Sequence, residues 1–397
     1  MTKILDHLFV TQDYAPDRGG MARRHVELCR RFGDAANKME VSTVMLESAA
    51  AFDRGESYPI HRQPFYFREA NRFANQVAWA RWLTSDRREP VDVMHCGNIR
   101  PVGYAVSWAH SRLKIPYIIY VNGGDLLREQ IKAERSTLKR AGARRILGQA
   151  AGIAATSKWV ADLTRSVMEQ VGVKEIPPIA ALDLGTDPEI FSPYKDSGRL
   201  RATWRVGNAP VMLTVARLVP HKGQDTGIRV LAALSSEFRD LRYVMVGEGH
   251  HELQLRVLAE QLGVEDRVVF AGPIPDSDLP EAYATSTVYL GPSRVDNTIN
   301  VEGFGISFLE ASASGIPVVA GDSGGVRSAV RDGITGCVVP PGDVDRMSAS
   351  VAGFLRDEGR RLAFGSAGRN AVETHYNWDR VARDTREFTL SVLKDRK

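Results

Sequence analysis

The sequence holds few cysteines and no long apolar run. The three cysteines, Cys29, Cys96 and Cys337, lie far apart, and none belongs to a CxxC pair. The sequence therefore indicates neither a disulfide framework nor a structural zinc site, and we expect a reducing, cytoplasmic setting. No apolar stretch approaches the roughly 20 residues that a membrane-spanning helix needs, and the opening residues are too interrupted for a signal peptide. These absences argue against a secreted or membrane-spanning protein.

Length and charge divide the chain into two parts. Its 397 residues exceed one typical domain, so we expect two or three domains. Residues 1–185 carry 27 Lys and Arg against 20 Asp and Glu, a net +7, whereas the remaining residues carry 25 against 28, a net −3. A basic half beside an acidic half suggests that the first half meets something anionic. Uneven, solvated surface charge is the alternative explanation.

The most informative stretch is residues 299–325, which begins INVEGFGISFLEASASG. Glu302 opens a glycine-broken turn, and helical spacing follows from Ile306 to Ser314. Glycines before a helix let the backbone approach an anion, and the first-turn N–H groups point at it. Glu310 follows Glu302 at a distance of about 12 Å along a helix. This spacing suits a sugar nucleotide, with phosphates at the helix start and hydroxyls on either side; an ordinary turn with surface glutamates is the alternative.

The same stretch resembles a known family. Two glutamates separated by seven residues, Glu302 and Glu310, are similar to the Glu-x7-Glu signature of retaining glycosyltransferases of family 4. Further matches run from Gly19-Gly20 to about Trp378, and the likeness is greatest to the bacterial phosphatidylinositol mannosyltransferases. The resemblance implies an α/β architecture, the GT-B fold, with two Rossmann-like domains facing each other across a cleft. It places the domains as follows: an acceptor-binding domain at 1–193, a nucleotide-sugar-binding domain at 194–378, and a last helix, 379–397, that crosses back onto the first.

The resemblance also implies a donor site. Arg217 and Lys222 match an Arg and a Lys that clamp the donor diphosphate, a role for which fixed cations are suited without a metal ion. Glu302 would accept hydrogen bonds from the sugar and Glu310 from the ribose. The backbone groups implied at the phosphates are those of Gly19, Gly20, Met21, Gly303, Phe304, Gly305 and Ile306. We expect no metal and no cofactor, because the nucleotide sugar is a substrate.

One position departs from the family pattern. Where the family has a histidine that contacts the transferred sugar, this sequence has Asn122. An asparagine donates and accepts hydrogen bonds but carries no proton at neutral pH. Asn122 is nevertheless grouped with the catalytic residues Arg217, Lys222 and Glu302. His95 and Asp125, both near predicted strand ends, are weaker acceptor-side candidates, and for His95 a structural role is the alternative.

The activity that the resemblance implies is retaining hexosyl transfer. A nucleoside-diphosphate sugar, GDP-mannose or a UDP-hexose, would donate to a hydroxyl of a lipid-linked or glycan acceptor, with the leaving phosphate taking the proton. A covalent route through Glu302 is the alternative mechanism. The alternative functions are a pseudoglycosyltransferase, a nucleotide-sugar 2-epimerase and a non-catalytic sugar-nucleotide binder. No nucleic-acid partner is expected.

Two cationic stretches indicate an anionic membrane surface as a further partner. Residues 61–88 interleave aromatic residues with arginine, a pattern found at membrane interfaces. Residues 126–149 are predicted to form one long cationic helix, with positions 128, 132, 135 and 139 on one face. We therefore expect a cytoplasmic enzyme peripheral to the inner face of a membrane. A soluble acceptor, or aromatics that pack on the sheet, would explain the same residues.

Overall fold

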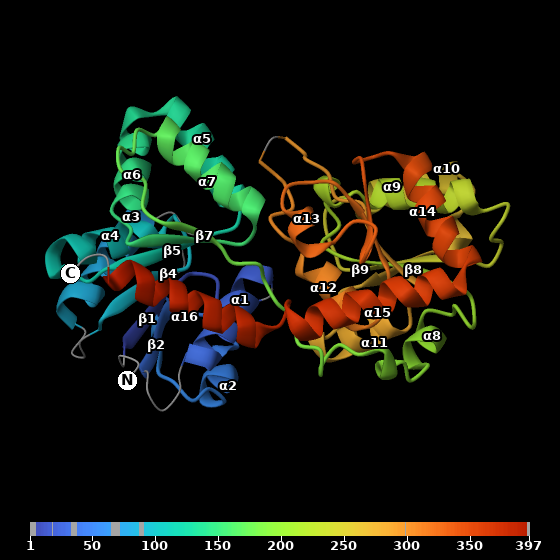
Figure 1. Ribbon diagram of the computed structural model, residues 1–397, viewed down its shortest axis with the longest axis horizontal. Helices are drawn as coiled ribbons and strands as arrows, with labels where there is room; N and C mark the ends of the chain where they lie inside the picture. The colour runs from blue at the N-terminus through green and yellow to red at the C-terminus, as the bar shows by residue number, and fades with distance from the viewer. Residues whose placement is uncertain are drawn as a thin grey trace. The chain divides into compact units, whose positions relative to one another are not determined.

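The computed structural model describes residues 5–17, 19–32, 38–64, 72–86, 91–297 and 299–394. These residues form two compact units. The first unit joins Met1–Asp183 to Trp378–Lys397, and the second spans Leu184–Asn377. The chain thus leaves the first unit at Asp183, whereas the boundary was predicted near residue 193. In each unit, helices cover both faces of a parallel sheet (Figure 1).

The sheet of the first unit is parallel throughout its described strands. In sheet order these are β3 (Ile60–Gln63), β2 (Lys38–Val44), β1 (Asp6–Val10), β4 (Val93–Cys96), β5 (Tyr117–Val121), β6 (Gly152–Ala155) and β7 (Ile179–Ala181). The helices are α1 (Gly20–Phe32), α2 (Ala49–Arg54), α3 (Arg72–Arg81), α4 (Val102–Leu113), α5 (Gly124–Arg135), α6 (Thr137–Gly148), α7 (Lys158–Gln170) and α16 (Trp378–Lys394), with a π-helical turn, η1 (Trp82–Asp86), after α3.

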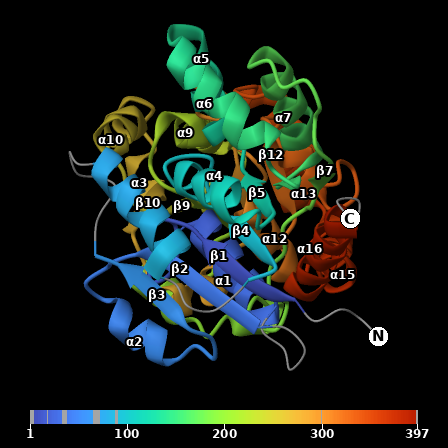
Figure 2. The ribbon, with the colours of Figure 1, turned by 90° about the vertical axis from the view of Figure 1, so that its left-hand side faces the viewer.

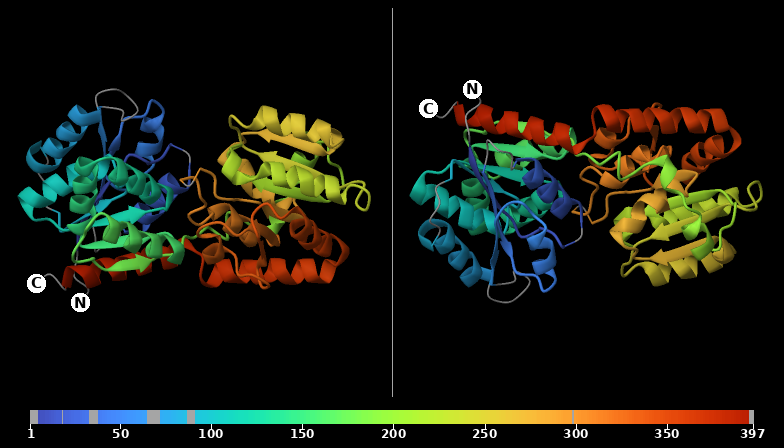
Figure 3. Two further views of the ribbon diagram at one scale, coloured as in Figure 1. Left: turned by 90° about the horizontal axis from the view of Figure 1, so that it is seen from above. Right: turned by 90° about the horizontal axis from the view of Figure 1, so that it is seen from below.

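Alternate residues of the central strands face opposite layers of helices. Leu8 and Val10 of β1 belong to the core cluster that also holds residues of α3, α4, α6 and α7. Phe9 points the other way, where its ring lies 4.8 Å from that of His25 on α1. The last helix, α16, lies along the first unit (Figure 3) and contacts α1 and β6. This strict alternation is what a sheet buried on both faces requires.

The cationic stretch 126–149 forms two helices, so the prediction of one long helix was wrong. Between α5 and α6, Ser136 has an extended backbone, with φ −156° and ψ 120°. Its side chain accepts a hydrogen bond from the N–H of Lys139 at 3.3 Å and so caps α6. A serine favours such a cap because its hydroxyl satisfies a free N–H at the start of a helix. Because the break precedes Lys139, positions 128, 132, 135 and 139 do not share one helix face.

The second unit repeats the architecture with six parallel strands among its described residues. In sheet order these are β10 (Val268–Gly272), β9 (Arg242–Val246), β8 (Val211–Val215), β11 (Val288–Gly291), β12 (Val318–Gly321) and β13 (Gly336–Val339). The helices are α8 (Arg199–Thr203), α9 (Gln224–Leu234), α10 (Glu252–Gln261), α11 (Leu279–Ala284), α12 (Ile306–Ala313), α13 (Val326–Ala329), α14 (Val344–Arg356) and α15 (Glu358–Thr374). Short 3-10 turns are η2 (Pro193–Lys195), η3 (Pro220–Lys222), η4 (Glu265–Arg267) and η5 (Asp276–Asp278).

Two helix layers enclose the second sheet. Figure 1 shows α9, α10 and α14 on one side and α11, α12 and α15 on the other. The first layer packs on Met212, Met245 and Leu290, which are fully buried. Strands β8 and β11 are neighbours at the centre of the sheet, and both lead into the segments that hold the predicted donor residues. No helix in the described ranges is long and apolar enough to cross a bilayer.

Candidate functional site

The predicted helix start in the second unit is present at α12. Gly305 has φ +94°, and a Cβ there would lie 2.4 Å from the Phe308 ring, so conformation and space both require glycine. Phe304 is buried, with its ring centroid 6.4 Å from that of Tyr376, and this contact anchors the turn. Among the described residues, no side chain caps the start of α12. The first-turn N–H groups, around Ile306, therefore suit an anion such as a phosphate.

Lys222 and Glu302 meet at the carboxyl ends of β8 and β11. The Lys222 Nζ lies 2.5 Å from the Glu302 Oε2, and both side chains are largely shielded from solvent. The close approach of the two segments depends on Gly223, which has φ +72° and where a Cβ would lie 1.9 Å from the Pro292 carbonyl oxygen. Ligands of α/β sheets gather at the carboxyl ends of strands. The two residues thus lie where a donor is expected.

Arg217 also follows β8, five residues before Lys222. Its side chain is exposed, while its backbone carbonyl accepts a 2.9 Å hydrogen bond from the buried Gln224 side chain. The backbone is therefore fixed while the guanidinium extends into solvent. An exposed guanidinium offers a planar fork of donors that matches a phosphate.

Glu310 lies on the buried face of α12. It is 4% exposed, and its Oε2 accepts a 2.6 Å hydrogen bond from the hydroxyl of the buried Tyr283. Tyr283 belongs to an aromatic cluster with Phe191 and Tyr289. The tyrosine thereby fixes the orientation of the carboxylate. The sequence did not predict the contact of Tyr283 with Glu310.

His221 and Arg294 are two further residues that sequence reasoning missed. Burial and the neighbouring Lys222 lower the pKa of His221 to about 4, so the imidazole is neutral at pH 7. The His221 carbonyl accepts a 2.9 Å hydrogen bond from the Arg294 N–H. The Arg294 guanidinium in turn pairs with Asp225 on α9 at 2.8 Å. These contacts connect the loop after β11 to the turn that holds Lys222. The only sign of them in the sequence is that Arg294 and Asp225 carry opposite charges.

In the first unit, the predicted glycine pair opens α1. Gly19 has φ +142°, and Gly20 is the first residue of the helix. Both glycines are exposed, and Met21 is half-buried. The first turn of α1 contains no acidic residue. Its N–H groups and positive helix end are thus suited to an anion.

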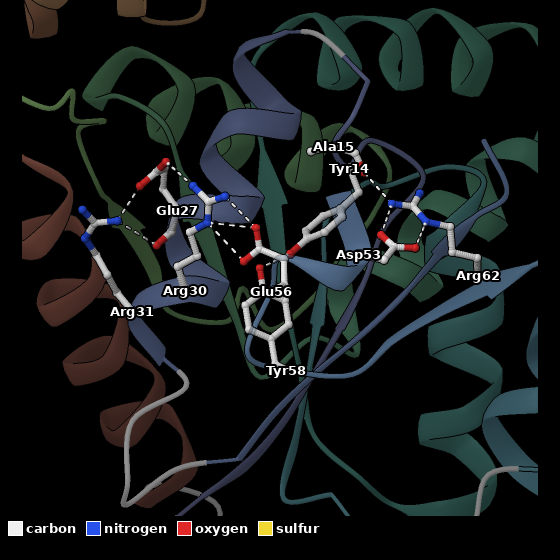
Figure 4. A network of polar contacts seen from close by, with 9 residues as sticks. All are labelled: Tyr14, Ala15, Glu27, Arg30, Arg31, Asp53, Glu56, Tyr58 and Arg62. Carbon is white, nitrogen blue, oxygen red and sulfur yellow. Dashed lines mark hydrogen bonds and ion pairs between the residues drawn. The ribbon is translucent and has the colours of Figure 1, made fainter. Parts of the chain in front are cut away.

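The loop that leads to Gly19 is held by polar contacts (Figure 4). Arg62 on β3 donates a 2.6 Å hydrogen bond to the Ala15 carbonyl and pairs with Asp53 at 2.7 Å. The hydroxyls of Tyr14 and Tyr58 lie 2.7 Å apart. Contacts with β3, α2 and Tyr58 thus hold Tyr14 and Ala15 of this loop in place.

Asn122 and Asp125 form one small structure at the carboxyl end of β5. The Asp125 carboxylate accepts hydrogen bonds from the backbone N–H groups of Asn122 at 3.1 Å and Leu126 at 3.0 Å. Burial raises the pKa of Asp125, although these hydrogen bonds oppose the shift. Gly123, with φ +97°, permits the sharp turn. The Asn122 Nδ2 is buried and has no hydrogen-bond partner among the described residues. It therefore has a hydrogen atom to donate, whereas Asp125 serves to shape the loop.

His95 lies inside the first unit. It is fully buried, and its Nε2 lies 2.9 Å from the His7 Nδ1 while its Nδ1 lies 2.9 Å from the Tyr120 hydroxyl. Burial lowers the pKa of His95 well below its usual value. Because both ring nitrogens have partners and the ring is out of reach of solvent, we assign His95 a structural role in place of the predicted acceptor-side role.

A groove of about 1860 Å³ runs along the first unit. It begins at residues 12–17, the loop before Gly19, and extends to α6. Its walls come from α3, α4 and α6, which Figure 2 shows on the same side of the sheet. Four apolar lining side chains are exposed, namely Phe73 at 79%, Val77 at 47%, Trp108 at 56% and Leu138 at 78%. The basic lining residues are Arg81, Arg100, Arg112, Lys132, Lys139 and Arg145. Three acidic residues, Asp13, Asp17 and Glu47, also line the groove, so its basic residues outnumber its acidic ones. Apolar walls with an excess of cations suit an anionic amphiphile.

The groove only partly coincides with the cationic and aromatic stretches predicted from sequence. Lys132, Lys139 and Arg145 line it, whereas Arg128 and Arg135 do not. The predicted aromatics at 65–67, and the side chains of Arg68, Arg72, Arg87 and Arg88, lie outside the described residues. Trp79 is fully buried, and its indole N–H donates a 2.8 Å hydrogen bond to Ser42. Trp108 and Leu138 were not predicted at all, because isolated apolar residues in a helix give no signal of exposure.

Within the described ranges, no cluster of three or more His, Cys, Asp and Glu side chains is arranged to hold a metal ion.

Two family models match the chain. The model of the glycosyl transferase 4-like domain matches residues 19–177, and the model of glycosyl transferases group 1 matches residues 199–371. A curated relative from Mycobacterium tuberculosis, a GDP-mannose-dependent alpha-(1-6)-phosphatidylinositol monomannoside mannosyltransferase, is 31% identical over 96% of this chain and 97% of its own length. A Corynebacterium glutamicum enzyme, described as acting on monoacylated alpha-(1-6)-phosphatidylinositol monomannoside, is 28% identical over 94% of each chain.

Solved structures show the same fold. HepE of Anabaena in complex with UDP and glucose is 20% identical, with a TM-score of 0.77 over 98% of this chain and 99% of that one. The sucrose-phosphate synthase of Thermosynechococcus elongatus gives a TM-score of 0.78 at 20% identity over 98% of this chain and all of that one. The predicted GT-B fold of two Rossmann-like domains is confirmed. With family models over both units and a 31% identical relative along nearly its whole length, this chain belongs to the GT-B glycosyltransferases of family 4.

Proposed function

We propose that this glycosyltransferase moves a hexosyl unit from a nucleoside-diphosphate sugar to a hydroxyl of a lipid-linked acceptor, with retention of configuration. The observation that carries the proposal is the gathering of Lys222, Glu302 and the uncapped start of α12 at the carboxyl ends of neighbouring strands. GDP-mannose is the first donor to test, because the Mycobacterium tuberculosis relative is GDP-mannose-dependent. A UDP-hexose is the second.

In the proposed reaction, cations stabilise the departing diphosphate. The acceptor oxygen bonds to the anomeric carbon as the bond from that carbon to the diphosphate oxygen breaks. The acceptor proton passes to the leaving phosphate on the same face of the sugar. Arg217, Lys222 and the α12 amides face the negative charge that develops, so they contribute most in the transition state. Each charge-assisted hydrogen bond contributes about 1.5–3 kcal/mol, and the proposal requires no metal ion.

The polar groups around the sugar take positioning roles. Glu302 accepts a hydrogen bond from a hydroxyl of the hexose. Glu310, oriented by Tyr283, accepts a hydrogen bond from a ribose hydroxyl. Asn122 donates a hydrogen bond to the sugar from its Nδ2, which has no hydrogen-bond partner among the described residues. Because an amide does not titrate at neutral pH, Asn122 orients the donor without moving a proton.

The groove of the first unit is the proposed acceptor side. Its exposed apolar residues suit acyl chains, and its basic rim suits the phosphate of a lipid headgroup. The names of both curated relatives contain phosphatidylinositol monomannoside, which supports a phospholipid-derived acceptor. We therefore propose that the protein acts at an anionic membrane surface, with this groove toward the lipid.

A thermal-shift panel tests the donor half of the proposal. GDP, UDP, GDP-mannose and UDP-glucose are added to the wild-type protein and to Arg217→Ala. A ligand that binds only the folded state at about 100 times its Kd stabilises it by about 2.7 kcal/mol. One nucleotide series should raise the Tm of the wild type and shift the variant less. No shift with any nucleotide would refute the proposal, and a free epimerised nucleotide sugar as the product would favour the 2-epimerase.

A further inference from the structure

Lys222 is paired with an anionic side chain. Its Nζ lies 2.5 Å from the Glu302 Oε2. The side chains are 21% and 14% exposed, respectively, so water screens the pair less than it screens an ion pair at the surface. The pair joins the turn after β8 to the segment that opens α12.

Arg217, the other cation predicted to bind the diphosphate, has no such partner among the described residues. The side chain of Arg217 is exposed and forms no hydrogen bond or ion pair with any described residue. One cation is therefore fully available to a phosphate, whereas the other already shares its charge with a carboxylate. His221, next to Lys222, adds no charge at pH 7 because it is neutral.

A diphosphate that recruits Lys222 leaves Glu302 without its cation. The uncompensated carboxylate is then partly buried and close to a phosphate of the same sign, and both circumstances oppose binding. A donor that still carries its sugar compensates Glu302, because a sugar hydroxyl donates a hydrogen bond to it. A spent nucleoside diphosphate has no hexose, so no hexose hydroxyl offsets the loss of the cation at Glu302.

From this asymmetry we infer that the Lys222–Glu302 ion pair makes the site discriminate the intact nucleotide sugar from the spent nucleoside diphosphate. The inference rests on the proposed function, because it takes a nucleotide sugar as the ligand. The pair re-forms when the sugar has left, and its re-formation helps to expel the product. Glu302 is in this account a specificity residue as well as a ligand of the sugar.

Isothermal titration calorimetry on the full chain tests the inference. GDP and GDP-mannose, or UDP and UDP-glucose, are titrated into the wild type and Glu302→Gln. The substitution keeps the side-chain size and removes the charge, so the nucleoside diphosphate should bind about 10-fold tighter, which corresponds to about 1.4 kcal/mol. The ratio of the affinities for the nucleotide sugar and the nucleoside diphosphate should fall by at least that factor.

Glu237→Gln is the matched control. Glu237 also pairs with an arginine, Arg356, at 2.5 Å, but it lies in the segment between α9 and the amino end of β9, so its removal should leave both affinities unchanged. Glu302→Ala serves as a second variant if Glu302→Gln fails to fold. Equal or weaker binding of the nucleoside diphosphate by the folded variant would overturn the inference and leave the proposed function in place. A wild type that binds neither ligand would overturn both.

Discussion

Charge reversal at the rim of the groove should release the protein from anionic membranes. Arg112 on α4 and Lys139 on α6 both line the groove and are exposed. Neither side chain pairs with a described residue, so Arg112→Glu/Lys139→Glu should leave folding nearly unchanged. Each cation near an anionic leaflet contributes about 1 kcal/mol, and each reversal replaces attraction with comparable repulsion. The double variant should therefore lose about 4 kcal/mol, roughly 1000-fold in partition coefficient.

Liposome sedimentation at low salt measures this loss. The matched control is Arg165→Glu/Lys174→Glu, which changes the net charge equally on exposed positions of the first unit outside the groove. Raising the salt to 1 M shortens the Debye length to about 3 Å. Wild-type binding to the vesicles should then fall to the part that apolar contacts contribute. Trp108→Ala should reduce that remaining share, because this side chain is 56% exposed at the groove.

The reasoning fails if the groove variant and the control sediment alike. It also fails if the wild type binds no anionic vesicle at low salt, in which case the acceptor is soluble. Neither result would change the assignment of the fold or of the donor residues Arg217, Lys222, Glu302 and Glu310, because these lie in the second unit and the groove lies in the first.

Further predictions concern the donor residues, and steady-state kinetics with binding measurements check them. Arg217→Ala or Lys222→Ala should lower turnover at least about 100-fold, as expected for the loss of a charge-stabilising group; wild-type turnover in both would refute their role. Glu310→Ala should weaken binding of the bare nucleotide, and Tyr283→Phe should weaken it less while reducing discrimination between ribose and 2′-deoxyribose nucleotides; unchanged discrimination would leave Tyr283 a purely structural residue. Asn122→His should remain folded and partly active, and the wild-type rate should show no titration from this position; an inactive variant with intact donor binding would contradict the assignment.

Much of the fold was predictable because its signals are local. Buried parallel strands appear as short apolar runs, and the turn before α12 has the glycines that its backbone requires. The helix α15 was missed, because its apolar residues follow no clear helical period. The break at Ser136 was missed as well, since a serine inside a periodic pattern signals a cap only when its backbone leaves the helix.

The site was less predictable because its contacts are distant in sequence. Lys222 and Glu302 were each named from their motifs, but their ion pair joins residues 80 positions apart. His95 stands at the end of a predicted strand, yet the side of the sheet that it faces is buried under α1 and α16. The groove depends on exposed residues of three helices, and exposure is set by packing rather than by residue type.

The central claim is nucleotide-sugar-dependent transfer to a lipid-linked hydroxyl. The most direct measurement follows labelled hexose from GDP-mannose, and from a UDP-hexose, into the lipid of phosphoinositide-containing vesicles, with NMR of the product's anomeric centre. The account predicts labelled lipid with the anomeric configuration of the donor for one nucleotide series, and almost none with Arg217→Ala. An inverted product would contradict the proposed mechanism. No labelled lipid with any donor, from a protein that binds the nucleotide sugar, would contradict the proposed acceptor.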